Sequence, residues 1–274
     1  MAKLEDIVSL CKRRGFIFQG SDVYGGMAGT WDFGPLGVSL KKKLKDLWWQ
    51  YWVENRNDMY GVDAAIIMNP RTWVASGHAA TFSDPLVECK SCHGRFRADK
   101  LAKTAEGHDL STEITGEELI KAGIKCPTCG KIEWGEVKPF NMMFQTHVGA
   151  VSDNSSIAYL RPETAQGIFT NYKNVVDTIY PDLPFGLAQQ GKAFRNEISP
   201  RDFIFRCREL EQMEIEYFVH PNDWERAFEE WRQAFWDFLT SLGLPKEAIH
   251  ELEVPEADRA HYSKRTIDFE FDYP

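Results

Sequence analysis

The sequence lacks long hydrophobic runs, an apolar stretch near its first residue and an excess of positive charge. A helix that crosses a bilayer needs roughly 20 consecutive apolar residues, so no membrane-spanning segment is expected. The opening residues Met-Ala-Lys-Leu-Glu-Asp lack the apolar centre of a secretory signal. The net charge is −9, whereas proteins held on nucleic acid by general phosphate attraction are normally basic. A non-specific nucleic-acid coat is therefore excluded, and we expect a soluble cytoplasmic protein.

What the chain does contain is ample material for a buried core. Hydrophobic residues make up 43 % of its 274 residues and aromatic residues 13 %, which excludes intrinsic disorder. The length corresponds to one large domain or two ordinary ones. No internal repeat and no low-complexity tract interrupts it.

The cysteines predict a metal centre. Four of the six form two C-x-x-C pairs, Cys89 with Cys92 and Cys126 with Cys129, separated by 33 residues. Each pair can point two thiolates at one position from a single turn, so two pairs predict a closed structural Zn²⁺ site. Gly94 and Gly130 follow the turns and are expected to relieve backbone crowding. The alternatives are reduced pairs without metal, or one redox pair; Cys11 and Cys207 are expected to be lone thiols.

Hydrophobic periodicity predicts an α+β fold, with helices packed on a mainly antiparallel sheet. The polar segment Ala98 to Gly123 is expected to be an excursion held at its base by the metal, because it has too little apolar material to fold alone. The expected helices are Gly37 to Asn57, one capped by Thr164, and Trp224 to about Gly243. The expected strands are Gly61 to Pro70, Ile157 to Leu160, Ala188 to Asn196, Leu210 to Val219 and Thr266 to Asp272.

An arginine-rich loop joins the two predicted strands at residues 188–219. Arg195 follows the first strand within Phe194-Arg195-Asn196-Glu197, and Arg206 precedes the second. Guanidinium groups match phosphate oxygens in bidentate geometry, so two arginines at opposite edges of the loop can hold a polyphosphate. The alternative is a solvated surface loop.

Several motifs together resemble those of class II aminoacyl-tRNA synthetases. Phe194-Arg195-Asn196-Glu197 resembles motif 2, and the long helix with the strand ending at Pro70 resembles motif 1. Further segments narrow the resemblance to glycyl-tRNA synthetases of the homodimeric type, covering their N-terminal and partial catalytic region. These segments are Trp31-Asp32-Phe33-Gly34-Pro35-Leu36-Gly37, Ala75-Ser76-Gly77-His78 and Arg161-Pro162-Glu163-Thr164-Ala165-Gln166-Gly167.

The resemblance implies that glycine and ATP, with Mg²⁺, form glycyl-adenylate, and that the glycyl group then passes to tRNA(Gly) on a homodimer. It assigns catalysis to Arg195, Glu197 and Arg206. It assigns ATP binding to Arg195, Asn196, Glu197, Phe205, Arg206, Cys207, Arg208, Glu209 and Leu210. It assigns glycine binding to Arg97, Glu163, Leu210, Glu211, Gln212, Met213 and Glu214. The family usually has an aromatic residue where this chain has Leu210, so adenine stacking there is expected to be weaker or supplied by Phe205.

The resemblance also implies a division of the chain into three parts. Residues 1–88 would be the first part of the catalytic domain with motif 1, residues 89–135 the zinc-binding insertion, and residues 136–274 the catalytic core with motif 2. Motif 3 and the anticodon-binding domain are not found in the sequence, so we expect a truncated chain.

Most of these side chains also have a purely structural interpretation. Glu163 can favour a helix dipole, Glu214 and Glu216 can form an exposed strand face, and Arg97 can lie on the surface. His78 is expected to be a hydrogen-bonding structural histidine, and Lys41 to Lys45 a solvated helix face. Two rival functions remain: a non-catalytic synthetase-like accessory subunit, and a zinc-ribbon nucleic-acid-binding module.

Overall fold

The computed structural model describes residues 3–103 and 114–273 and has the expected α+β class. The helices are α1 (Leu4–Arg13), α2 (Pro35–Trp49), α3 (Pro70–Ala75), α4 (His78–Thr81), α5 (Ala98–Ala102), α6 (Gly116–Lys121), α7 (Ala165–Ile179) and α8 (Trp224–Ser241). The strands are β1 (Ile17–Gln19), β2 (Trp31–Phe33), β3 (Met59–Gly61), β4 (Ile67–Met68), β5 (Ser83–Glu88), β6 (Arg95–Arg97), β7 (Lys138–Asn141), β8 (Gln145–His147), β9 (Ile157–Leu160), β10 (Phe185–Phe194), β11 (Glu209–Phe218), β12 (Ile249–Glu253) and β13 (Ile267–Phe271). Within the described ranges, no helix has both the length and the apolar character that a bilayer crossing requires.

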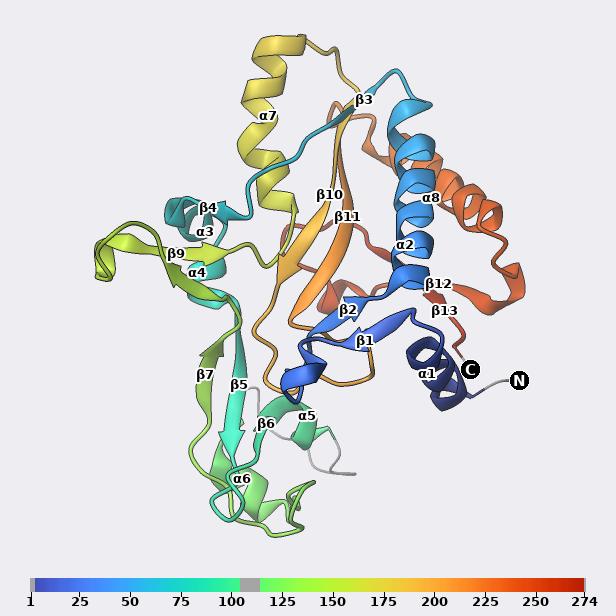
Figure 1. The fold of residues 1–274 in the computed structure, drawn as a ribbon. Helices are drawn as coiled ribbons and strands as arrows, with labels where there is room; N and C mark the ends of the chain where they lie inside the picture. The colour runs from blue at the N-terminus through green and yellow to red at the C-terminus, as the bar shows by residue number, and fades with distance from the viewer. Residues whose placement is uncertain (1–2, 104–113, 274) are drawn as a thin grey trace.

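The long hairpin β10–β11 is the centre of the fold (Figure 1). Its two strands pair antiparallel over their whole length, from Phe185 opposite Phe218 to Phe194 opposite Glu209. Strand β3 adds to β10 in parallel, which gives the order β11-β10-β3. The other sheets have two or three strands and pair antiparallel.

The hairpin has helices on both faces because both faces carry apolar side chains. On one face, Ala188, Ile215 and Tyr217 pack against aromatic residues of α2, the π-helical turn η2 (Gln50–Glu54) and α8. On the other, Phe185, Leu187 and Phe218 pack against α7. Figure 1 shows α7 on one side of the hairpin and α2 with α8 on the other.

The segment from β5 to β7 projects from the rest of the fold and has its own core (Figure 1). Leu101, Leu119 and Ile124 are buried there together with Val87 and Trp134. The apolar residues of α5 and α6 are buried against Val87 and Trp134, which lie outside residues 98–123. The expectation that this segment cannot fold alone and is held by the metal therefore stays a prediction. The middle of that expected excursion, residues 104–113, lies outside the described residues.

The expected strand from Gly61 to Pro70 was wrong. The chain instead forms two short strands in different sheets, β3 beside β10 and β4 beside β9, and Pro70 begins α3. The expected helix from Gly37 to Asn57 is present from Pro35, but its last turn is the π-helical η2. The strand β9 and the pair β10–β11 are confirmed near their expected bounds, as are α8 and β13.

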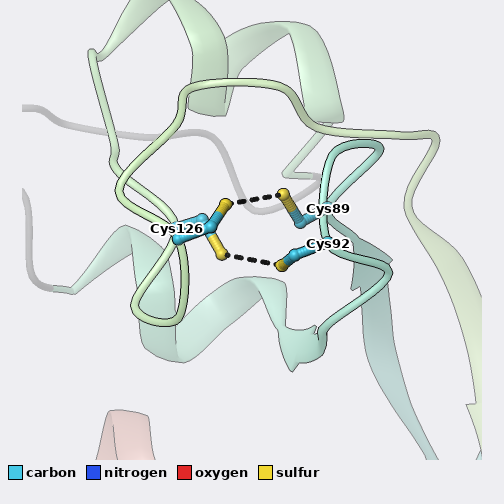
Figure 2. Close-up of side chains that lie close together, drawn as sticks. Cys89, Cys92 and Cys126 are labelled. Carbon is cyan, nitrogen blue, oxygen red and sulfur yellow. Dashed lines mark hydrogen bonds between the residues drawn. The ribbon is translucent and has the colours of Figure 1, made fainter.

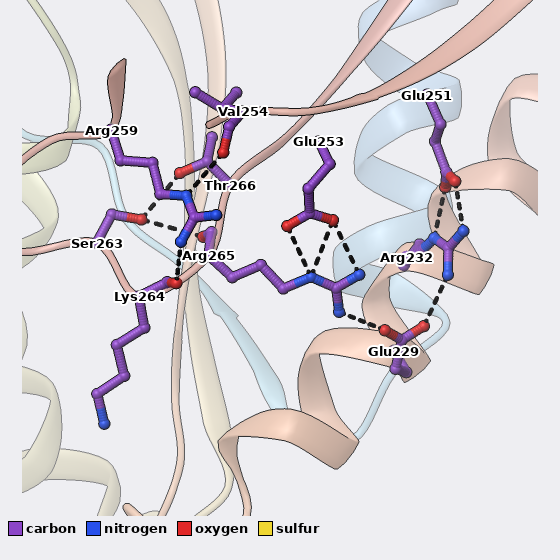
Figure 3. A network of polar contacts seen from close by, with 10 residues as sticks. All are labelled: Glu229, Arg232, Glu251, Glu253, Val254, Arg259, Ser263, Lys264, Arg265 and Thr266. Atoms are coloured by element: carbon purple, nitrogen blue, oxygen red, sulfur yellow. Dashed lines mark hydrogen bonds and ion pairs between the residues drawn. The ribbon is translucent and has the colours of Figure 1, made fainter. Parts of the chain in front are cut away.

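Ion pairs fix the hairpin β12–β13 to α8 (Figure 3). Arg232 of α8 forms an ion pair with Glu251 of β12. Arg265, just before β13, forms ion pairs with Glu253 of β12 and with Glu229 of α8. Aromatic packing of Phe235 and Trp236 on Phe269 accompanies these ion pairs. Ion pairs and aromatic contacts therefore both join α8 to the β12–β13 hairpin.

Candidate active site and metal centre

The polar half of the β11 face that looks toward α7 brings two carboxylates together. Glu214 and Glu216 lie two residues apart on this face, opposite Gln189 and Leu187 of β10. Glu163 approaches from the turn before α7, close enough to raise the pKa of both carboxyls by charge repulsion. Sequence alternation on β11 therefore correctly predicted one polar strand face, and this face is half-buried rather than fully exposed.

Thr164 connects this face to the start of α7. Its hydroxyl donates a hydrogen bond to Glu214, and its backbone N–H donates to Gln212 Oε1 (3.1 Å). The expected role of Thr164 as a side-chain helix cap was wrong, since the side chain forms no cap hydrogen bond. No signal in the sequence distinguishes this use of a threonine before a helix from capping.

Arg195 lies beside the carboxylates, directly after β10. Its Nε donates to the carbonyl of Pro162 (3.1 Å), and its guanidinium lies over the ring of Phe82. Its charge acts on both Glu163 and Glu214. Among the described residues, no carboxylate forms an ion pair with Arg195 or Arg206. Both guanidinium groups can therefore bind an external anion.

The three carboxyls have pKa values shifted in different directions. The hydrogen bond with His78 lowers the pKa of Glu163, although burial opposes it. Burial raises the pKa of Glu214, and the charge of Glu163 adds to this effect. Burial, followed by the charges of Glu214 and Glu163, raises the pKa of Glu216 to about 7. One carboxyl group thus has a lowered pKa and two have raised pKa values. Such a cluster favours a bound cation, because a cation stabilises the ionised form of each carboxyl group.

We expect Glu216→Gln to stabilise the folded protein at pH 8 by up to about 3 kcal/mol, and to change little near pH 4.5. A folded-state pKa of about 7, against an ordinary value of 4.5, means that the folded protein binds more protons between these values. Wild-type stability therefore falls as the pH rises through this window, whereas glutamine keeps the neutral form. Urea unfolding at both pH values measures the difference.

Glu211→Gln is the matched control on the same strand. Burial alone would raise the pKa of Glu211, but hydrogen bonds from Lys41 and Lys45 lower it. Its charge therefore adds stability above its unfolded pKa, so this variant should be less stable than wild type at pH 8. Equal stability of wild type and Glu216→Gln at pH 8 would contradict the burial of a charge at Glu216.

The residues assigned to glycine from Leu210 to Glu214 do not share one face. Leu210, Gln212 and Glu214 face α7, whereas Glu211 and Met213 lie on the face toward α2. Glu211 there pairs with Lys41 (2.8 Å) and Lys45 (3.2 Å) and lines a separate cavity of about 630 Å³ with Asp63 and Arg161. The solvated face expected for Lys41, Lys42, Lys43 and Lys45 is confirmed for Lys42 and Lys43, which are exposed, and wrong for Lys41 and Lys45, which reach this carboxylate.

The assigned Arg97 lies on β6 in the insertion. It forms ion pairs with Asp84 (2.6 Å) and Asp99 (2.8 Å), and Glu197 is near enough to raise its pKa further. The hydroxyl of Ser199 donates to the carbonyl of Arg95 (3.4 Å), so the arginine-rich loop contacts β6. The insertion and the loop after β10 thus meet at Arg97.

The residues assigned to ATP lie along the loop between β10 and β11 and at the start of β11, and they differ in their contacts. Arg208 is held by two backbone carbonyls, those of Glu197 and Ala28, and Glu209 pairs with Lys192. Asn196 donates its backbone N–H to Met142, Leu210 lies opposite Ala193, and the thiol of Cys207 is buried. Phe205 is 51 % exposed and packs on Tyr273, so its ring is accessible.

The loop at residues 20–30 supports the arginine-rich loop, which sequence reasoning missed. Gly29 accepts the backbone N–H of Arg208 (2.7 Å) and has a positive φ of 73°. A Cβ at Gly29 would meet Pro200 at 2.5 Å, so only glycine allows this approach. Gly29 precedes the quoted motif Trp31 to Gly37 by two residues, and no spacing rule indicates its partner.

The four cysteines of the two C-x-x-C pairs converge, and Figure 2 shows Cys89 and Cys92 facing Cys126. Their sulfurs all lie within 4.8 Å of one another, with Cys89 3.7 Å from Cys129 and Cys92 3.6 Å from Cys126. A tetrahedral Zn²⁺ with bonds of about 2.3 Å sets its sulfurs roughly 3.8 Å apart, so the four thiols fit such an ion.

The two turns match each other in their backbone. His93 and Gly130 follow the turns with φ of 56° and 75°, and their N–H groups donate to the carbonyls of Cys89 and Cys126. The expected role of Gly94 is confirmed, because its backbone N–H bonds Cys92 and a Cβ there would meet Phe96 at 2.9 Å and Cys92 Sγ at 3.3 Å. The left-handed conformation, however, is taken by His93. Cys11 and Cys207 are free thiols as expected.

The fold is that of the class II aminoacyl-tRNA synthetase core domain. Residues 144–273 match the tRNA synthetase class II core domain (G, H, P, S and T). A solved structure, the RNA binding domain of threonyl-tRNA synthetase from Cryptosporidium parvum Iowa II, has a similar fold with a TM-score of 0.54. It is 17 % identical and aligns over 87 % of this chain and 45 % of its own.

Within this class, the chain belongs to the glycine–tRNA ligases, which confirms the resemblance drawn from the motifs. It is 51 % identical to the glycine–tRNA ligase of Deinococcus radiodurans over 99 % of this chain and 58 % of that protein. It is 50 % identical to that of Streptomyces coelicolor over 98 % of this chain and 58 % of that protein. It is 47 % identical to that of Caldanaerobacter subterraneus subsp. tengcongensis over 99 % of this chain and 60 % of that protein. The chain thus spans about three fifths of the length of these relatives.

Proposed function

We propose that the protein containing this chain ligates glycine to tRNA(Gly) with ATP, through a glycyl-adenylate. The observation that carries the proposal is the convergence of Glu163, Glu214 and the unpaired Arg195 beside the half-buried face of β11. Two carboxylates suit an ammonium group, and an unpaired guanidinium next to them suits a phosphate. The names of the homologues support glycine and tRNA as the substrates.

In this mechanism the chain acts by holding charges in position. Glu163 and Glu214 bind the glycine ammonium, so that the glycine carboxylate points toward Arg195. Arg195 and Arg206 bind the phosphates of ATP, and Arg195 stabilises the charge that develops as the carboxylate attacks the α-phosphorus. Asn196, Glu197 and the segment Phe205 to Leu210 surround the nucleotide. Mg²⁺ arrives with ATP and neutralises phosphate charge.

The residues that would bind substrate argue against the accessory-subunit alternative. A subunit that only binds partners has no need for Arg195 and Arg206 to lack ion pairs, or for buried carboxylates with raised pKa values. The zinc-ribbon module explains only the segment between Cys89 and Cys129. The division at residues 88 and 135 stays a prediction; β5 and β7, which flank these two bounds, pair with each other. The cytoplasmic location also stays a prediction.

Glu214→Gln in the full-length protein is expected to raise the glycine KM by about tenfold or more and leave the ATP KM almost unchanged. The change removes a charge-assisted contact to the ammonium, which contributes about 1.5–3 kcal/mol. Glycine-dependent exchange of pyrophosphate into ATP measures both constants. Asp177→Asn is the control, because Asp177 lies on the exposed side of α7, is paired with Lys173 and is assigned to no substrate. A wild-type glycine KM in Glu214→Gln would remove the ammonium assignment.

We also propose a homodimer through α2. The sequence-based reason for this interface was partly wrong, because Trp48, Tyr51 and Trp52 pack inside the chain's own core. A different stripe supports it: Leu36, Leu40 and Leu47 of α2 are exposed, each by half or more. Sedimentation of the full-length protein at micromolar concentration should show a dimer, and Leu40→Lys should weaken it. A monomer at that concentration in wild type would contradict the interface.

A further inference from the structure

We infer that His78 is a positioning residue that holds the carboxylate of Glu163 in place, and that Ser76 fixes the ring of His78. This role rests on the proposed function, in which Glu163 faces the glycine ammonium. It differs from catalysis, because His78 acts on the substrate only through Glu163.

The geometry forms a chain of three side chains. His78 Nε2 lies 3.4 Å from Glu163 Oε1, and the opposite ring nitrogen, Nδ1, lies 2.9 Å from Ser76 Oγ. The His78 side chain is only 14 % exposed. Gly77 between Ser76 and His78 has a positive φ of 82°, which turns the chain so that Ser76 can reach the ring.

Aromatic rings hold the imidazole on both sides. Trp73 packs edge-on against it with centroids 5.7 Å apart, and Phe82 lies 5.4 Å away. Trp73 is completely buried, so this wall is rigid. The same Phe82 ring also lies under the guanidinium of Arg195. His78 and Arg195 are therefore placed by one shared aromatic side chain.

The contact with Ser76 determines whether Nε2, the ring nitrogen that faces Glu163, carries a hydrogen. If the serine hydroxyl donates to Nδ1, the neutral ring carries its hydrogen on Nε2 and donates it to Glu163. If the ring is protonated, both of its nitrogens donate. Ser76 Oγ then accepts the hydrogen of Nδ1 and donates its own hydrogen to the carbonyl of Trp73 (3.4 Å). Both states give Glu163 a donor. The remaining tautomer would put a lone pair against the carboxylate.

His78 is the stronger of two hydrogen-bond partners that lower the pKa of Glu163, and Gln166 is the other. Glu214 and Glu216 repel Glu163 from the β11 face, and Arg195 attracts it from the end of β10. Without His78, the carboxylate is expected to turn toward Arg195 and occupy the guanidinium that the phosphate requires. With His78, Glu163 stays ionised and faces the ammonium, and Arg195 stays unpaired.

Four substitutions in the full-length protein separate this role from simple packing. His78→Phe keeps the ring between Trp73 and Phe82 and removes both nitrogens. His78→Gln places an amide N–H near the former Nε2 position, whereas His78→Asn reaches only the Nδ1 position. Ser76→Ala removes the contact that orients the ring. Pyrophosphate exchange gives the glycine and ATP KM of each variant, and KM does not depend on the fraction of protein that folds.

We expect the glycine KM to rise about tenfold in His78→Phe and His78→Asn, to stay within about threefold in His78→Gln, and to rise about threefold in Ser76→Ala. A wild-type glycine KM in His78→Phe, or equal KM values in the glutamine and asparagine variants, would overturn the inference. If wild type itself shows no glycine-dependent exchange, the proposed function fails, and the role of His78 fails with it.

Discussion

Arg195→Ala is expected to lower the rate of glycine-dependent pyrophosphate exchange at saturating glycine and ATP by about 100- to 1,000-fold. Its guanidinium is held at Nε by the Pro162 carbonyl and by the face of Phe82, with no carboxylate paired to it in the described chain. It is therefore preorganised for charge that appears only in the transition state. An interaction of that kind lowers kcat when it is removed, even when the substrates are saturating.

Arg201→Ala is the matched control, because Arg201 lies in the same loop but is 57 % exposed and pairs with its neighbour Asp202. Its exchange rate should stay within about twofold of wild type, as for an exposed ion pair of little energetic weight. Arg195→Lys should recover only part of the rate, since lysine lacks the planar fork that fits phosphate. Equal kcat values for Arg195→Ala and wild type would contradict the assignment of Arg195 to the transition state.

Cys126→Ser is expected to abolish tight Zn²⁺ binding and unfold the insertion from β5 to β7. Wild type should hold about one Zn²⁺ per chain, on Cys89, Cys92, Cys126 and Cys129. Structural zinc contributes on the order of 10 kcal/mol to the folding of small domains, far more than the few buried side chains of this insertion can replace. Metal analysis gives the stoichiometry, and hydrogen exchange of Leu119 and Trp134 reports the local unfolding.

Cys207→Ser provides the control, since Cys207 is a buried thiol far from the four sulfurs in sequence and donates to the backbone carbonyls of Phe203 and Ile204. This variant should keep the metal and the protection of the insertion. A wild-type stoichiometry near zero after purification without chelators would remove the zinc assignment. Protection of Trp134 that persists after the metal is stripped would show that the apolar core alone folds the insertion.

Sequence reasoning succeeded where one local pattern decides the structure. The alternation in β11 predicted its polar face, and the spacing of the cysteines predicted their convergence. It failed where a tertiary partner decides. The pattern from Gly61 to Pro70 predicts one strand. In the structure Gly61 pairs with β10, whereas Ile67 and Met68 pair with β9, so the segment belongs to two sheets.

Motif-based transfer of the site had a related weakness. A contiguous stretch such as Leu210 to Glu214 belongs to both faces of a strand, so it cannot all meet one ligand. The sequence also gave no sign that Lys41 and Lys45 would cover Glu211, or that Thr164 would bind Glu214. These pairs are more than 45 residues apart along the chain, and no spacing rule connects them.

The ten-residue pairing of β10 with β11 has a consequence for how this chain can evolve. A shift of the hairpin by one residue would exchange its faces. It would turn Glu211 toward α7 and Glu214 toward α2, so Glu214 would leave Thr164 and Glu163, and Glu211 would leave Lys41 and Lys45. Single-residue insertions or deletions within β11 should therefore abolish glycine use even in variants that still fold.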